Sequence, residues 1–250
     1  MKEKGLRVIS YNVHKGFNPG NRSFVLHQIR DALAEADADL LFLQEMQGEH
    51  RHHERLIENW PKLSQFEFIA EGLWPFYIYG KNAVYNAGHH GNAILSRFPF
   101  VSWENINVSP YPWASRSVLH GVIQDPKSGT EVHIVCIHFG LTGKERSMQL
   151  TRLCDRIESH VPRDAPLIVA GDFNDWMGRA ESFFHDHLGL QEVFRVTHGG
   201  YARTFPSWLP ILPMDRIYFR GLTPISCERL SHKPWRMLSD HAPLAASFAL

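Results

Sequence analysis

The chain has 250 residues, of which 44% are hydrophobic and 12% aromatic, a composition that suits a globular protein with a sizeable buried core. Its 26 Lys and Arg residues equal its 26 Asp and Glu residues. No overall field therefore attracts a polyanion, which speaks against a protein built to grip long nucleic acids.

Short apolar runs recur along the chain and predict strands. In chain order they are Leu6–Asn12, Asp39–Glu45, Phe66–Ala70, Asn92–Ser96, Ser117–Gln124, Val132–His138, Leu167–Asp172, Asp215–Phe219 and Leu244–Leu250. Helical spacing of apolar residues predicts one helix after Asn21-Arg22-Ser23 that ends near Asp37, and a second over Arg146–His160. Strands dominate, and no repeat or linker divides the chain. We therefore expect one domain over residues 1–250, with two sheets face to face and helices outside.

The location of the protein is predicted from what the sequence lacks. No apolar run is long enough to span a bilayer, and the N-terminal MKEKGLRVIS has no apolar segment of a secretion signal. The three cysteines, Cys136, Cys154 and Cys227, are widely spaced and form no metal-binding motif. We expect a cytoplasmic monomer.

Several predicted strands end in a polar side chain that can bind a metal or a phosphate. These are Asn12 after RVISY, Glu45 after LLFLQ, His138 after HIVCI, and Asp172 and Asn174 in LIVAGDFN. An unpaired carboxylate or imidazole is costly inside a strand, whereas at a strand's end it can face a cleft. Taken alone, Ser239-Asp240-His241 before the last strand fits a polar turn better than a site. Together with the other strand ends, it forms a constellation.

Seven stretches occur in the order found in one family, and they cover nearly the whole chain. They are SYNVHKG (Ser10–Gly16), LFLQEM (Leu41–Met46), HGNAILSRFP (His90–Pro99), CIHFG (Cys136–Gly140), VAGDFND (Val169–Asp175), TFPS with MDRIYF (Thr204–Ser207, Met214–Phe219) and LSDHAPL (Leu238–Leu244). The chain resembles the endonuclease/exonuclease/phosphatase superfamily of metal-dependent phosphoesterases. The resemblance implies an α+β fold, a four-layered α/β sandwich in which two mostly antiparallel sheets pack face to face between helices.

The resemblance also implies roles for the matching residues. Glu45 would be the principal Mg²⁺ ligand, Asn12 would support the metal or the phosphate, and Asp240 would be a further carboxylate on the metal side. Such oxygen ligands, without a Cys cluster, suit a hard cation such as Mg²⁺ or Mn²⁺.

On the phosphate side, the implied roles divide between acids, imidazoles and amides. His241 would contact the scissile phosphate or act as acid or base, with Asp215 orienting its ring. Asp172 would activate or position the attacking water, and Asn174 would hold that carboxylate and the phosphate. His138 would bind a phosphate oxygen or protonate the leaving group. Further support would come from Arg146, Gln149 and Ser239.

The chemistry of phosphodiester hydrolysis requires such a set independently of the family. The substrate is anionic and repels nucleophiles, so a metal must neutralise an oxygen while a base delivers water in line. The leaving alkoxide then needs a proton or a cation. An Asp–His pair suits either task, because a carboxylate raises imidazole basicity and fixes the tautomer.

Other polar residues have two interpretations each. Asn92 either approaches the phosphate or caps a turn, and Arg116 is either a phosphate clamp or a solvated strand start. His89-His90 is more typical of a polar loop than of a ligand pair, and His185-Asp186-His187 more typical of a solvated helix face. Asp175 suits local hydrogen bonding.

Two rival functions make specific demands on the sequence. A calcineurin-like metallophosphoesterase needs an early DxH, a GNH[DE] and a late GHxH, and the sequence has none of them. A non-catalytic phosphate-binding module on the same fold would lack an acid or imidazole, and here every expected position is filled. One departure is that many relatives carry an Arg shortly before Asp215, where this chain has Leu212-Pro213-Met214.

The substrate is less defined than the reaction. Aromatic and apolar residues gather in Glu71–Gly80, Ser109–Trp113 and Ser207–Pro213, which we expect to be loops. Such residues stack bases in nucleases, contact a membrane interface in phospholipid-directed relatives, or cover core edges. Because the chain has no basic excess, a small phosphodiester or a lipid headgroup, with peripheral membrane contact, is favoured over DNA or RNA.

Overall fold

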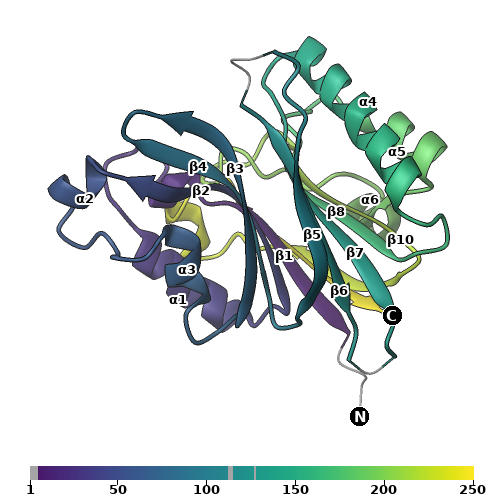
Figure 1. Cartoon of the computed structure of the whole chain (residues 1–250), viewed down its shortest axis with the longest axis horizontal. Helices are drawn as coiled ribbons and strands as arrows, with labels where there is room; N and C mark the ends of the chain where they lie inside the picture. Colours follow the sequence, from purple (N-terminus) through teal and green to yellow (C-terminus); the bar gives the residue numbers. More distant parts are fainter. Residues whose placement is uncertain (1–4, 112–114, 127) are drawn as a thin grey trace.

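The computed structural model describes residues 5–111, 115–126 and 128–250. In this part of the chain, two six-stranded sheets pack face to face, with α1–α3 beside one sheet and α4–α6 beside the other (Figure 1). None of the described helices is long and apolar enough to cross a membrane. The predicted four-layered sandwich is confirmed.

The first sheet has the strand order β11-β12-β1-β2-β4-β3. Its strands are β1 (Leu6–Asn12), β2 (Leu40–His50), β3 (Phe76–Tyr85), β4 (Gly88–Ser96), β11 (Thr223–Arg229) and β12 (Leu244–Ala249). Beside it lie α1 (Leu26–Ala36), α2 (His53–Leu56) and α3 (Gln65–Ala70). The pair β1 and β2 is parallel, and the other neighbours are antiparallel.

The second sheet has the order β5-β6-β7-β8-β10-β9, and its one parallel pair is β7 with β8. Its strands are β5 (Phe100–Asn107), β6 (Ser117–Gln124), β7 (Glu131–His138), β8 (Leu167–Asp172), β9 (Gln191–Glu192) and β10 (Asp215–Arg220). Its helices are α4 (Gly143–His160), α5 (Ala180–Leu188) and α6 (Val193–His198), and short 3₁₀ turns occupy His14–Gly16 and Trp235–Met237.

Side-chain alternation along the central strands builds three apolar layers. In β1, Val8 packs between the sheets with Phe42, whereas its neighbour Ile9 faces α1. In β7, Ile134 lies between the sheets and Val135 faces α4. Strands buried on both faces read as continuous apolar runs, which is why the sequence predicts them.

Three structural predictions are wrong. Phe66–Ala70 forms α3 rather than a strand, because Ser64 and Glu67 make a reciprocal capping box at its start. The second half of Glu71–Gly80 belongs to the edge strand β3 rather than to a loop, and His89-His90 lies within β4. Pro112 and Trp113 of the predicted loop Ser109–Trp113 lie outside the described residues.

Candidate active site

The polar strand ends converge at one edge of the sandwich. Leu6 at the start of β1 pairs with Phe248 near the end of β12, and β1 ends at Asn12, so Asn12 lies at the opposite end of the sheet from these two residues. In each sheet, the parallel pair brings two carboxyl-terminal strand ends side by side. Asn12 Nδ2 donates to Asp172 Oδ2 at 3.1 Å, a hydrogen bond that joins the two sheets at this edge.

Asp172 is the centre of the cluster. His138 Nε2 lies 3.6 Å and His241 Nε2 lies 3.8 Å from its Oδ2, while its Oδ1 accepts from the Asn174 N–H at 2.9 Å. Asn174 adopts a left-handed backbone with φ of 49° and donates from Nδ2 to Phe139 O. Burial raises the pKa of Asp172 above its ordinary value.

The two imidazoles beside Asp172 differ in charge. Burial lowers the pKa of His138 to about 4, and Arg116 acts in the same direction. Burial also lowers the pKa of His241, but Asp215 and Asp172 outweigh it and raise that pKa well above 6.5. His241 Nδ1 lies 2.8 Å from Asp215 Oδ2. The structure therefore pairs a neutral imidazole with a protonated one on the same carboxylate.

Thr204 is a support for Asp215 to which the sequence assigned no role. Its hydroxyl oxygen accepts from the N–H groups of Met214 and Asp215, at 3.3 and 3.2 Å. Its carbonyl accepts from Ala242 N–H at 2.9 Å, next to His241. The TFPS stretch therefore joins the Asp215 strand to the turn that carries His241. The sequence signal for Thr204 was its position in this stretch, which matches the family.

Glu45 lies at a bulge where the pairing of β2 with β4 shifts register between Leu43 and Met46. Its φ of 57° is strained for a residue other than glycine. Burial raises its pKa, but the attraction of His138, which is protonated only in acid, and of Lys15 outweighs burial and lowers it to about 2. The carboxylate is therefore ionised.

His14 and Lys15 lie against this carboxylate, and the sequence reading assigned them no role. Lys15 Nζ lies 3.4 Å and His14 Nδ1 lies 4.0 Å from Glu45 Oε2. His14 Nδ1 is also 3.3 Å from Asp240 Oδ1. The only sequence signal was their position in the SYNVHKG stretch, two and three residues after Asn12.

Ser239 holds the turn that bears Asp240 and His241. Its hydroxyl donates to Asn12 O at 2.7 Å and accepts from His241 N–H at 3.2 Å. The turn is thus fixed to the end of β1.

The remaining predicted groups brace the backbone around the cluster. Asn92 Nδ2 donates to Ser117 O at 3.4 Å, and Arg116 Nε donates to Phe139 O at 3.3 Å. Arg146 donates to Leu141 O at 2.6 Å, and Gln149 accepts from Gly140 N–H at 2.8 Å.

Two polar groups outside the cluster behave as expected. Asp175 accepts from Ala180 N–H at 2.8 Å and pairs with the buried Arg216, so it serves local structure. His185 and Asp186 are exposed on α5.

The carboxylates fit a hard cation. Glu45 Oε2 is buried and accepts no hydrogen bond from the described residues, so its lone pairs remain for a ligand. Glu45 and Asp240 both lie beside His14 Nδ1, and both carboxylates offer oxygen atoms, the ligands that Mg²⁺ prefers. A second group that could hold an ion is Asp172, Asp215 and His241, whose ligand atoms lie within 4.8 Å of one another.

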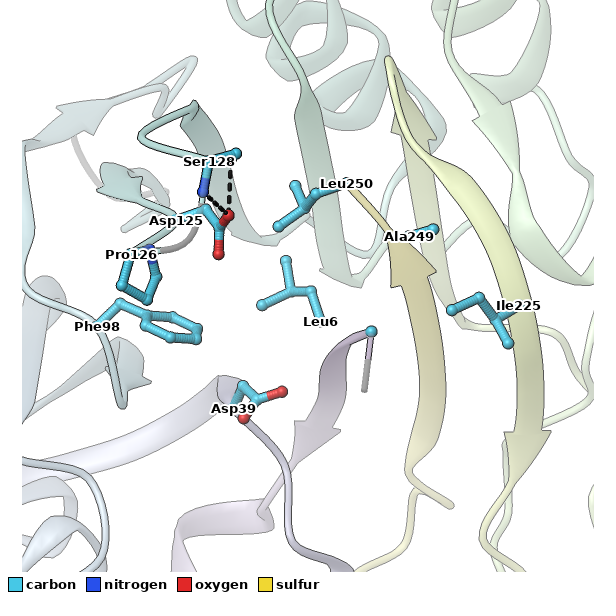
Figure 2. A pocket seen from close by; sticks show the side chains of 10 residues that line it. Leu6, Asp39, Phe98, Asp125, Pro126, Ser128, Ile225, Ala249 and Leu250 are labelled. Atoms are coloured by element: carbon cyan, nitrogen blue, oxygen red, sulfur yellow. Dashed lines mark hydrogen bonds between the residues drawn. The ribbon is translucent and has the colours of Figure 1, made fainter. Parts of the chain in front are cut away.

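A cavity of about 390 Å³ lies elsewhere, beside the first and last residues of the terminal strands (Figure 2). Leu6, Phe98 and Leu250 line it together with Asp39. The Asp39 carboxylate is already engaged, because it accepts from Arg7 N–H at 2.9 Å and pairs with Arg97. This cavity is separate from the polar cluster.

Comparison with known proteins identifies the family of the chain. The sequence model of the Endonuclease/Exonuclease/phosphatase family matches residues 9–241. The chain belongs to this family. An uncharacterized protein of Escherichia coli (strain K12), YbhP, is 43% identical over 244 residues, which cover 98% of this chain and 96% of YbhP.

Solved structures of family members have the same fold. An endonuclease/exonuclease/phosphatase from Bacteroides vulgatus superposes with a TM-score of 0.77 at 19% identity, covering 99% of this chain and all of the other. Humanized D. rerio TDP2 superposes with a TM-score of 0.73 at 22% identity, covering 98% and 99% of the two chains. Members of the endonuclease/exonuclease/phosphatase family are generally hydrolases and typically depend on a divalent metal.

Proposed function

We propose that the protein is a Mg²⁺-dependent phosphodiesterase that hydrolyses its substrate by in-line attack of water. The observation that carries the proposal is the contact set around Asp172, where one buried carboxylate faces an amide, a neutral imidazole and a protonated imidazole. This set offers a base, a neutral donor and a cationic donor within a few ångströms. The ionised Glu45 lies beside it.

Glu45 and Asp240, supported by the Asn12 amide, would hold Mg²⁺, with Mn²⁺ as a substitute. When bound, the ion would neutralise a non-bridging oxygen of the phosphate. Lys15 forms an ion pair with Glu45, and His14 lies against Asp240.

We assign the attacking water to Asp172. Burial raises its pKa, which makes it a stronger base than an exposed carboxylate, and Asn12 and Asn174 fix its two oxygens. His241, kept protonated by Asp215, would donate to a phosphate oxygen. His138, whose lowered pKa leaves it neutral, would donate a hydrogen bond to a phosphate oxygen, and its other implied role as proton donor to the leaving group passes to the protonated His241. Phosphate binding would be supported by Asn92, Arg116 and Arg146.

The substrate that we propose is a small phosphodiester or a lipid headgroup. The equal numbers of acidic and basic residues support it over a long polyanion. The alternatives are an endonuclease or exonuclease that acts on DNA or RNA, and a non-catalytic phosphate-binding module.

Hydrolysis of bis-(p-nitrophenyl) phosphate with and without Mg²⁺ tests the reaction. We expect metal-dependent turnover that is lost in Asp172→Asn and retained in Asp186→Asn, a control at an exposed carboxylate on α5. No turnover with any divalent ion would favour the binding module. A panel of single-stranded and duplex nucleic acids, phospholipids and inositol phosphates then identifies the substrate, and preference for a nucleic acid would establish the nuclease alternative.

A further inference from the structure

Exposed apolar side chains gather on the loops that leave the catalytic edge. They belong to three segments, and the solvent-exposed fractions of the residues lie between 44% and 67%. We call these residues the apolar rim: Leu141, Trp176, Met177, Trp208, Leu209 and Ile211. Each segment begins close to a residue of the Asp172 cluster, since Leu141 follows His138 by three positions and Trp176 follows Asn174 by two.

Contacts between the loops join two segments of the rim and place the third beside the site. Arg146 donates to Leu141 O at 2.6 Å and stacks over the Trp176 ring at 5.1 Å, which joins the first two segments. The backbone at Gly178, two residues further on, lies close to the Tyr201 ring, which precedes the third segment. Ser207 N–H donates to Asp240 O at 2.7 Å, so Trp208 lies next to the turn that carries Asp240. The rim therefore borders the site.

Some large exposed apolar residues elsewhere lie on edge strands. Val101 and Trp103 lie on the edge strand β5, and Ile225 lies on the edge strand β11. Scattered residues of this kind are normal on protein surfaces. A set of six around the mouth of a site indicates an interaction surface.

The exposed charges on the rim's own segments are basic. In residues 139–144, 173–179, 201–213 and 230–238 they are Lys144, Arg179, Arg203, Lys233 and Arg236. The acid in these segments, Asp175, is buried against Arg216, and the neighbouring Glu145 and Asp240 are partly buried. The outermost charges around the rim are therefore cationic, although the chain has no net charge.

We infer that the apolar rim docks the catalytic edge onto an anionic phospholipid surface. Trp, Leu, Ile and Met at exposed loop tips insert at the boundary of headgroups and acyl chains, and neighbouring Lys and Arg attract anionic lipids. Single-stranded nucleic acid fits less well, because four of the six rim residues are aliphatic and cannot stack on bases. The inference rests on the proposed phosphodiesterase for its purpose, since the lipid headgroup would supply the phosphodiester.

Flotation of the full chain with lipid vesicles tests the docking. The wild type should bind vesicles of phosphatidylcholine with phosphatidylglycerol, and bind vesicles of phosphatidylcholine alone more weakly. The triple variant Trp208→Ser/Leu209→Ser/Ile211→Ser should lower binding about tenfold or more. Lys144→Glu/Arg203→Glu should remove the preference for the anionic lipid. The control Val101→Ser/Trp103→Ser should bind like the wild type.

The two proposals fail separately. The triple variant should keep its melting temperature and its turnover of bis-(p-nitrophenyl) phosphate, because its three residues lie outside the Asp172 cluster. Docking is overturned if the wild type binds neither kind of vesicle, if the triple variant binds as well as the wild type, or if the rim variants lose single-stranded DNA binding instead. Vesicle binding without any phosphodiesterase turnover would support the docking proposal and contradict the proposed reaction.

Discussion

At the scale of single residues, the site separates the pKa values of buried groups that lie within a few ångströms of one another. Burial raises the pKa of Asp172, whereas nearby cations lower that of Glu45 to about 2. The pKa of His138 falls to about 4, and that of His241 rises. Such divergence provides an acid, a base and an ionised ligand at one pH, which is what phosphodiester hydrolysis needs.

Glu45→Gln should lower the affinity for Mg²⁺ sharply, because it removes the negative charge and one of the two oxygens and keeps the shape of the side chain. The fold should persist, and added Mg²⁺ should restore only part of the turnover. Isothermal titration calorimetry measures the affinity. Glu49→Gln, at an exposed position of the same strand, is the matched control. Equal affinity in Glu45→Gln and the wild type would place the metal elsewhere.

His241→Ala should cut turnover by about 100- to 10,000-fold, the usual range for a lost acid or base. Asp215→Asn should keep the fold and lose much of the same factor, because the imidazole is no longer held protonated and in one orientation. The double variant should be little worse than His241→Ala, since groups that act as a unit are not additive.

Steady-state kinetics of the three variants, with calorimetry for Mg²⁺, checks this pairing. His241→Ala should keep the affinity for Mg²⁺, whereas Asp240→Ala should weaken it. Losses that multiply fully in the double variant would disprove the pairing.

The sequence predicted which strand ends gather, because their polar residues follow apolar runs that must be central strands. It gave no role to His14, Lys15 or Thr204. Their contacts depend on left-handed backbone at the first two positions and on a loop that returns beside β10 at the third. Residue spacing along the chain carries no information on such contacts.

At the scale of elements, prediction succeeded for central strands and failed at the edges. β5 and β11 expose most of their residues and so lack the continuous apolar run of β7 or β8. The short α3 has the apolar density of a strand, and only its capping box distinguishes it. Edge strands are therefore determined by their partner in the sheet rather than by their own pattern.

The start of α6 gives a prediction about stability. Glu192 is buried and accepts from Arg195 N–H at 2.9 Å. Burial raises its pKa from 4.5 to about 7. Between these values the folded protein binds more protons than the unfolded chain, so the free energy of unfolding falls as the pH rises.

Glu192→Gln keeps the accepting oxygen and removes this titration. As the pH rises through this window, the free energy of unfolding of the variant should increase relative to that of the wild type, by at most about 3 kcal/mol. Denaturant unfolding at a series of pH values measures the difference. Glu158→Gln, at an exposed position on α4, should show the same pH dependence of stability as the wild type. Parallel curves for Glu192→Gln and the wild type would contradict the assignment.

At the scale of the whole molecule, the two sheets have a similar strand arrangement, and the site depends on how they pack against each other. Each sheet has six strands with one parallel pair, and the carboxyl ends of the two pairs meet where Asn12 bonds to Asp172. These residues are 160 positions apart in sequence. The apolar layer between the sheets, which includes Val8 and Ile134, therefore holds the two halves of the site in register.

Acid should loosen this assembly through buried histidines on the outer face of the second sheet. His120 Nε2 and His133 Nδ1 lie 3.0 Å apart, and Glu104 pairs with both His120 and Arg156. Burial and the neighbouring His133 lower the pKa of His120 from 6.5 to about 4, although Glu104 acts in the opposite direction. Between these values the unfolded chain binds more protons, so the stability is fully present above the window and is lost as the pH falls through it.

Replacing His120 by Gln should reduce the loss of stability at low pH, because Gln retains a hydrogen-bond donor and an acceptor for His133 and does not titrate. The loss that we assign to His120 in the wild type is at most about 3 kcal/mol. Denaturant unfolding of wild type and His120→Gln across the window measures it. His185→Gln, at an exposed histidine on α5, should keep the slope of the wild type. If His120→Gln loses stability with acid as steeply as the wild type, protonation of this pair does not drive the unfolding of the second sheet.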